Sequence, residues 1–83
     1  MTEWQITKFF RARLSPEIAV AVVERPRDFF ASFWHRTTGE VVSFAIPKQG
    51  LNGDLNDPRH RLLSYLQPNL DTLNAKANAV VGQ

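Results

Sequence analysis

The strongest constraint on the fold of this chain is a pair of apolar runs on either side of a Thr-Thr-Gly sequence. Residues 28–36 and 40–46 are rich in aromatic and β-branched side chains, which are typical of β-strands. The residues between them, Thr37, Thr38 and Gly39, are typical of a tight reversal of the chain. The sequence therefore predicts a β-hairpin with strands over 28–36 and 40–46.

The first of these strands carries four aromatic side chains within six positions, at Phe29, Phe30, Phe33 and Trp34. Successive side chains of a strand point to opposite faces of the sheet, so the strand must divide these aromatics between the two faces. A two-residue turn places Phe29 and Phe33 in the core. A three-residue turn instead places Phe30 and Trp34 there. One helix covers only one face, so one aromatic pair needs a second cover, from this chain or from a partner.

Residues 4–14 fit a strand better than a helix. Alternation places most of the apolar residues on one face, although Lys8 and Phe9 break the pattern. The helical alternative depends on a capping box between Thr2 and Gln5, followed by apolar residues at helical spacing. We predict a strand here and keep the helix as the alternative.

Residues 18–25 predict a further strand. The run IAVAVVE is rich in β-branched residues and ends at Pro26 after about eight positions. This length and composition favour a buried strand over a helix.

The last third of the chain predicts a long helix. Asp57 and Pro58 form a helix start, because Asp is favoured as an N-cap and Pro at the first helical position. Apolar residues then recur every three or four positions, at Leu62, Leu66, Leu70, Leu73, Ala77 and Val80. Pro68 interrupts this stripe without changing its phase, so we expect one helix over 58–81 that is kinked at Pro68. The alternative is a break at Pro68, with Asn69 capping a second helix.

These elements predict a single α+β domain over residues 1–83. Four strands, near 4–14, 18–25, 28–36 and 40–46, form an antiparallel β-meander. A loop over 47–57 leads to the C-terminal helix, which packs on one face of the sheet.

The composition restricts the classes of function. Ten basic and eight acidic residues give a net charge of only +2, so the electrostatic attraction to nucleic acid is weak. The chain contains no cysteine, which excludes disulfides, thiolate zinc sites and cysteine nucleophiles. The N-terminus does not resemble a signal peptide, and no run approaches the ~20 apolar residues of a membrane span. We expect a cytoplasmic protein that does not interact with membranes.

Neither a metal site nor a cofactor site is expected. Asn52, Asp54 and Asn56 alternate as at the start of a calcium loop. However, the sixth position of that loop is Asp57 instead of Gly, and the twelfth is Leu63 instead of Glu. Turn formation and helix capping explain these residues.

Catalysis is not expected either, because the sequence lacks a nucleophile elbow, a phosphate-binding glycine loop and a dinucleotide fingerprint. One remote alternative is a metal-independent ribonuclease. It would use His35 and His60 as acid and base, with nearby arginines on the phosphate, at Arg36, Arg59 and Arg61.

The favoured function is a small regulatory or inhibitory accessory protein that binds another protein and forms a homodimer. Aromatic side chains beside arginine are typical of protein interfaces, which indicates a surface of Phe30, Trp34 and Arg36. A 24-residue helix spans about 36 Å, more than the ~15–20 Å width of four strands. We therefore expect its end to overhang the sheet and to expose Leu73, Ala77 and Val80, through which the homodimer would form.

The alternative function is binding of single-stranded nucleic acid, which requires aromatic platforms and cations along a groove. The residues expected to form that surface are Lys8, Arg11, Arg13, Phe30, Trp34 and Arg36. Clustering of the arginines on the aromatic face would favour nucleic acid, and their dispersal would favour a protein partner.

Overall fold

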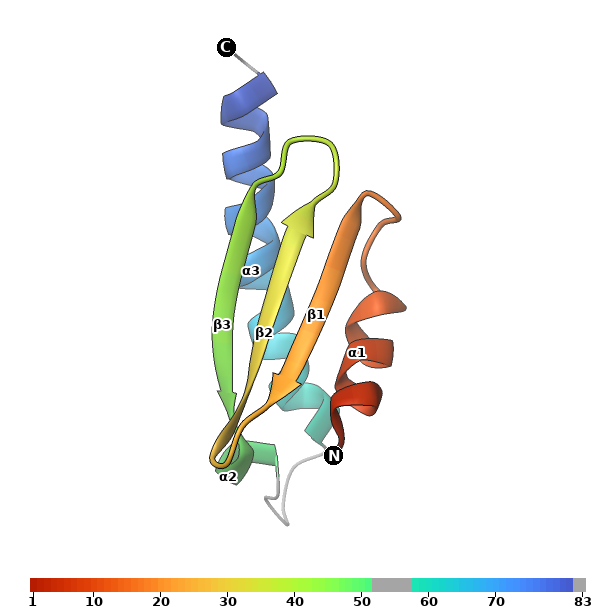
Figure 1. Cartoon of the computed structure of the whole chain (residues 1–83), viewed down its shortest axis with the longest axis vertical. Helices are drawn as coiled ribbons and strands as arrows, with labels where there is room; N and C mark the ends of the chain where they lie inside the picture. The colour runs from red at the N-terminus through yellow and green to blue at the C-terminus, as the bar shows by residue number, and fades with distance from the viewer. Residues whose placement is uncertain (52–57, 82–83) are drawn as a thin grey trace.

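The computed structural model describes residues 1–51 and 58–81. Its elements are α1 (Glu3–Arg11), β1 (Ile18–Glu24), β2 (Asp28–His35), β3 (Val41–Pro47), α2 (Lys48–Leu51) and α3 (Pro58–Val81). The strands form an antiparallel sheet in the order β1-β2-β3, and α3 lies behind it in Figure 1. The α+β class, the antiparallel sheet and the C-terminal helix are therefore confirmed.

The strand predicted over 4–14 is wrong, because this segment forms helix α1. The capping box at its start is complete. The Gln5 amide donates to the Thr2 hydroxyl at 3.2 Å, and the Thr2 amide donates to the Gln5 side chain at 2.9 Å. Helical spacing also buries Ile6, Phe9 and Phe10 together, whereas a strand would have placed Phe9 and Phe10 on opposite faces.

The hairpin uses neither of the two predicted turns. The His35 amide donates to the Glu40 carbonyl at 2.9 Å, so the turn contains the four residues 36–39. Gly39 has a φ of 77°, in the left-handed region that favours glycine. A four-residue turn shifts the register by two residues relative to a two-residue turn, which keeps every side chain on the same face. Phe29 and Phe33 are therefore buried, as the two-residue turn predicts.

The core lies between the inner face of the sheet and the helices α1 and α3. Phe10 of α1 meets Phe33 of β2 edge to face, with ring centroids 5.2 Å apart. Phe33 meets Phe44 of β3 in the same way at 5.1 Å, and Tyr65 of α3 stacks on Phe44 at 5.9 Å. Both helices therefore pack on the same face of the sheet.

Helix α3 runs from Pro58 to Val81 without a break at Pro68, so the two-helix alternative is wrong. The kink at Pro68 stays a prediction. The segment predicted as a loop over 47–57 begins with Pro47, the last residue of β3, and continues with the short helix α2, and its residues 52–57 lie outside the described residues. This last range includes Asn52, Asp54, Asn56 and Asp57, which were compared with a calcium loop, whereas Leu63 of that comparison lies in α3.

Candidate protein-binding face

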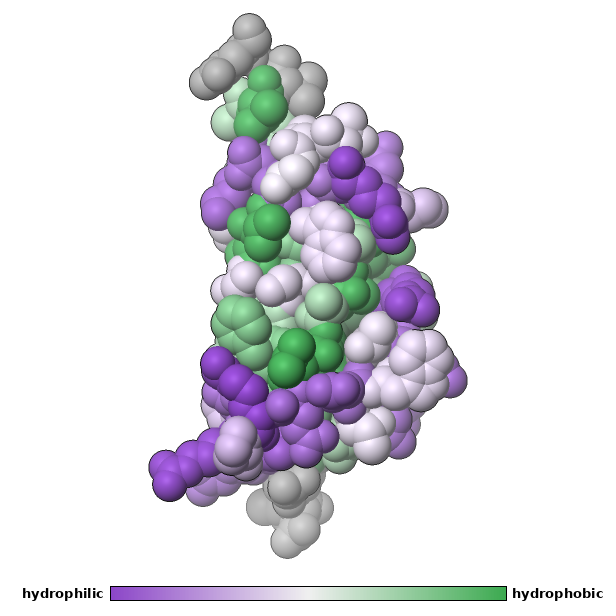
Figure 2. Space-filling model, viewed as in Figure 1, coloured by the Kyte–Doolittle hydropathy of each residue, from purple (hydrophilic) through white to green (hydrophobic). Residues whose placement is uncertain are grey.

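The face of the sheet opposite the helices, here called the outer face, is covered by none of the described helices. The strand register places small and apolar side chains on it: Ala19, Ala21, Val23, Phe30, Ser32, Trp34, Val41, Ser43 and Ala45. Figure 2 shows this face, with a hydrophobic patch over the strands and hydrophilic residues around it. The outer face carries no charged side chain in its centre.

Several large side chains of the outer face are accessible. Val23 is 55% exposed, Val41 45% and Phe30 37%, while Trp34 is half-buried. The hydroxyls of Ser32 and Ser43 hydrogen-bond to each other across the strands at 2.9 Å. In this pair one hydroxyl donates and the other accepts, so each serine in the middle of the face has a hydrogen-bond partner within the sheet.

The Phe30 end of the outer face is bordered by a cation. The Arg25 guanidinium lies 4.9 Å from the centroid of the Phe30 ring. Asp28 holds it with two hydrogen bonds, of 2.6 and 2.7 Å. These bonds, together with the charges of Arg25 and Lys48, lower the pKa of Asp28 below its ordinary value, and Asp28 raises the pKa of Arg25. The result is an aromatic ring beside a fixed guanidinium.

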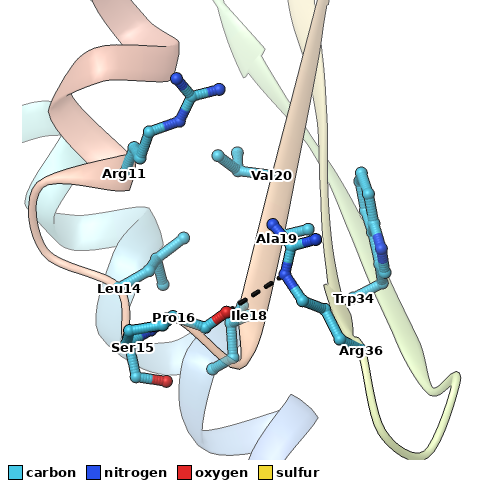
Figure 3. A pocket seen from close by; sticks show the side chains of 9 residues that line it. All are labelled: Arg11, Leu14, Ser15, Pro16, Ile18, Ala19, Val20, Trp34 and Arg36. Atoms are coloured by element: carbon cyan, nitrogen blue, oxygen red, sulfur yellow. Dashed lines mark hydrogen bonds between the residues drawn. The ribbon is translucent and has the colours of Figure 1, made fainter.

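The Trp34 end of the outer face continues into a pocket of about 470 Å³ at the edge of β1. Figure 3 shows Arg11 reaching toward it from α1 on one side of β1, and Trp34 and Arg36 lying on the other side. The Nε of Arg36 donates to the Pro16 carbonyl at 3.1 Å, which fixes this side chain. The remaining lining residues are Leu14, Ser15, Ile18, Ala19 and Val20, so two cations and no acid line the pocket.

The residues predicted for nucleic-acid binding are only partly brought together. Arg11, Trp34 and Arg36 meet at the pocket. Lys8 lies against the exposed ring of Trp4 on α1, at 5.8 Å from its centroid. Arg13 stacks on Phe9 at 3.7 Å and donates to the Phe9 carbonyl. The cations are thus distributed over α1, the pocket and the Phe30 end of the sheet.

The residues predicted on the helix overhang occupy different environments. Figure 1 shows α3 extending past the turn between β2 and β3. Leu73 and Ala77 are nonetheless buried, whereas Val80 is 46% exposed. Of these three side chains, Val80 is accessible on the surface.

The two histidines of the ribonuclease alternative are not brought together. His35 ends β2, with its Nε2 3.6 Å from a Glu17 carboxylate oxygen. His60 lies in the first turn of α3, at the opposite end of the sheet in Figure 1. The described residues contain no group of three or more His, Cys, Asp or Glu side chains arranged to hold a metal ion.

Sequence reasoning missed Val23 and Val41 on the outer face and Arg25 at its border, as well as the exposed Trp4 on α1. The signal for Val23 and Val41 was present, because alternation from Phe30 and Trp34 across the strands leads to them.

None of the helices in the described part of the chain combines the length and hydrophobicity needed to cross a bilayer. Comparison of the chain with family models, curated proteins and solved structures finds no match.

Proposed function

We propose that this chain is a non-enzymatic module that binds another protein through the outer face of its sheet. The observation that carries the proposal is the position of α1 and α3 on the same side of the sheet, which leaves an apolar face with Phe30, Val23 and Val41 accessible. An accessible apolar patch bordered by polar residues is typical of an interaction site. A regulatory or inhibitory accessory role suits a domain of this size.

The two ends of the outer face supply the anchors of the proposed interface. At one end, Phe30 lies beside Arg25, and at the other, Trp34 lies near Arg36. Aromatic and arginine side chains provide much of the binding energy of protein interfaces. The dispersal of the other cations also supports a protein partner over a nucleic acid.

Self-association through this face is part of the proposal, and the size of the face sets its strength. Three strands about 4.8 Å apart and about 23 Å long present roughly 330 Å² per copy. Two copies would then bury on the order of 700 Å², less than the ~1,200 Å² of a stable complex. We therefore expect a weak homodimer, measurable by sedimentation equilibrium.

A photo-crosslinking experiment tests the proposed interface. The photoreactive residue p-benzoylphenylalanine replaces Phe30 on the outer face, and in a matched control it replaces Tyr65 of α3, a half-buried residue whose ring stacks on Phe44 on the opposite side of the sheet. Irradiation in the cell that makes the protein should give a discrete protein adduct for the Phe30 variant alone, identifiable by mass spectrometry. Adducts of equal yield from both variants, or none from either, would contradict the proposal.

Binding of single-stranded nucleic acid is the second candidate, because Arg11, Arg36 and Trp34 line one pocket. Fluorescence anisotropy with labelled dT12 and rU12 tests it at low and moderate salt. Micromolar binding that weakens steeply with salt and is lost in Trp34→Ala would replace the first proposal.

A further inference from the structure

The free edge of β1 has backbone groups that no described residue engages. The Arg36 amide donates to the Glu17 carbonyl, and the Arg25 amide donates to the Asp28 carbonyl. In an antiparallel ladder, these bonds direct the odd-numbered residues of β1 toward β2. The backbone N–H and C=O groups of Val20 and Val22 therefore face the free edge.

Both ends of this edge are occupied by the chain itself. The Glu24 amide donates to a carboxylate oxygen of Glu3 on α1, and the Ile18 amide donates to the Ser15 carbonyl at 3.0 Å. Glu3 thereby supplies the acceptor that an adjacent strand would supply. The open length lies between the two ends, at residues 20–22.

The pocket with two cations lies at the Ile18 end of this open edge. Arg11 reaches it from the helical side of the sheet, and Arg36 lies on the outer side (Figure 3). Ala19, which pairs with Trp34 across the strands, is too small to cover the side of the indole. An added strand would thus meet a guanidinium on each face and an indole on one of them.

We propose that the free edge of β1 binds an extended, acidic segment of a partner protein, which adds to the sheet as a fourth strand. This inference rests on the proposed function and names the chemistry of the partner. Backbone hydrogen bonds to Val20 and Val22 would hold the segment. Two adjacent acidic residues of a strand point to opposite faces, so one would reach Arg11 and the other Arg36.

A second copy of the chain does not fit this edge. Figure 1 shows α1 alongside the free edge of β1, on the side opposite β2. A two-fold axis between two β1 edges would place both α1 helices on the same side of the joined sheet and next to that axis, where they would collide. A single added strand brings no second α1, so it has to fit only against this chain's own α1, which packs on the inner face of the sheet.

Peptide binding tests this inference directly. The probe is a fluorescein-labelled peptide, Ser-Val-Glu-Asp-Val-Ser, titrated with the protein and followed by anisotropy at low salt. Two further peptides carry N-methyl groups on alternate residues, in opposite phases. Strand addition predicts that one of these two peptides does not bind, because its N-methyl groups face β1 and block the backbone hydrogen bonds. The other peptide should still bind, because its N-methyl groups face away from β1. Equal affinity of the two methylated peptides would overturn the proposal.

Protein variants locate the site. Arg11→Gln and Arg36→Gln should each weaken binding about 3- to 10-fold, as expected for loss of a charge-assisted hydrogen bond at the surface. Arg36→Lys keeps the charge and should retain most of the affinity. The control, Arg27→Gln, alters an exposed arginine in the turn between β1 and β2 and should leave the affinity unchanged. Circular dichroism checks that each variant is folded.

The remaining outcomes separate this inference from the proposed function. Absence of peptide binding up to millimolar concentration would overturn the edge site, while a protein adduct at Phe30 would leave the outer-face proposal standing. If dT12 displaces the labelled peptide at a lower concentration than the unlabelled peptide does, the site at the edge of β1 binds nucleic acid, and the peptide proposal is overturned. If Arg27→Gln and Arg36→Gln lower the peptide affinity equally, the peptide is bound by nonspecific charge attraction. That result would also overturn the proposed site at the edge of β1.

Discussion

Phe29 and Phe30 offer a direct test of the division of the sheet into two faces. They are neighbours in β2 and identical in chemistry, but Phe29 is buried against the helices and Phe30 lies on the outer face beside Arg25. Replacing each in turn with alanine therefore compares the inner and the outer face at nearly the same place in the sheet. The proposed interface depends on this division.

The expected losses in the free energy of unfolding differ clearly. Truncating a fully buried Phe to Ala removes its transfer energy and leaves a cavity, at a cost of about 3–5 kcal/mol. Phe30 borders solvent, so no closed cavity forms, and the loss of partial burial and of the contact with Arg25 costs about 1–2 kcal/mol. A domain of this size has a total stability of roughly 4–12 kcal/mol. Phe29→Ala therefore brings the protein close to unfolding, whereas Phe30→Ala leaves it folded.

Urea unfolding followed by far-UV circular dichroism measures both variants against the unsubstituted chain. If Phe29→Ala leaves too little folded protein for an unfolding curve, Phe29→Leu provides a milder change at the same site. A loss for Phe30→Ala that equals or exceeds the loss for Phe29→Ala would show that the faces are exchanged. The outer face would then have to be reassigned to the side that carries Phe29 and Phe33.

Three further predictions concern local structure. Asp28 has a lowered pKa in the folded chain, so the stabilisation from its pair with Arg25 is complete above the ordinary value of 3.8 and is lost as the pH falls through the lowered value; an NMR titration of the Asp28 carboxyl that gives a pKa at or above 3.8 would contradict this. Thr2→Ala removes one half of the capping box of α1 and should cost about 1 kcal/mol, seen as a Tm lower by about 4–8 °C, whereas an unchanged Tm would show that the cap contributes nothing. Gly39→Ala places a side chain at a φ of 77° and should lower the free energy of unfolding by about 1–2 kcal/mol. A Cβ there meets no atom within 4 Å, so any loss comes from backbone strain. A urea midpoint equal to that of the unsubstituted chain would show that there is no such strain.

Alternation and helical spacing were sufficient to predict most of the fold. Most of the large strand residues are β-branched or aromatic. The helical spacing from Leu62 to Ala77 matches the burial of four of its five residues, and Leu70 is partly buried. The N-terminal segment was mispredicted because its alternation fits a strand at most positions. Two local signals favour the helix instead: the capping box between Thr2 and Gln5, and the adjacent buried pair Phe9 and Phe10.

The binding surfaces were predicted less completely, for a different physical reason. Which aromatic pair faces outward depends on the length of the turn after His35, and four residues of Thr, Arg and Gly type do not define that length. The burial of Leu73 and Ala77 depends on how far the sheet extends beneath α3. The pocket joins residues from α1, the segment after α1, β1, β2 and the turn after β2, so it follows from tertiary packing alone.

The two edges of the sheet differ in a way that favours the edge of β1 as the binding edge. Folded proteins protect exposed edges, because unpaired backbone groups there accept further strands. On β3 the Lys76 ammonium donates to the outward Val41 carbonyl at 3.1 Å, and Pro47 at the other end has no N–H to offer. On β1 the corresponding protection comes from Glu3 at one end and from the Ser15 carbonyl at the other, and the strand between them is an uncharged run of Ala and Val. Because Arg11 and Arg36 line the pocket at the Ile18 end of the open residues 20–22, a segment that brings its own carboxylates would gain charge partners there in addition to backbone partners.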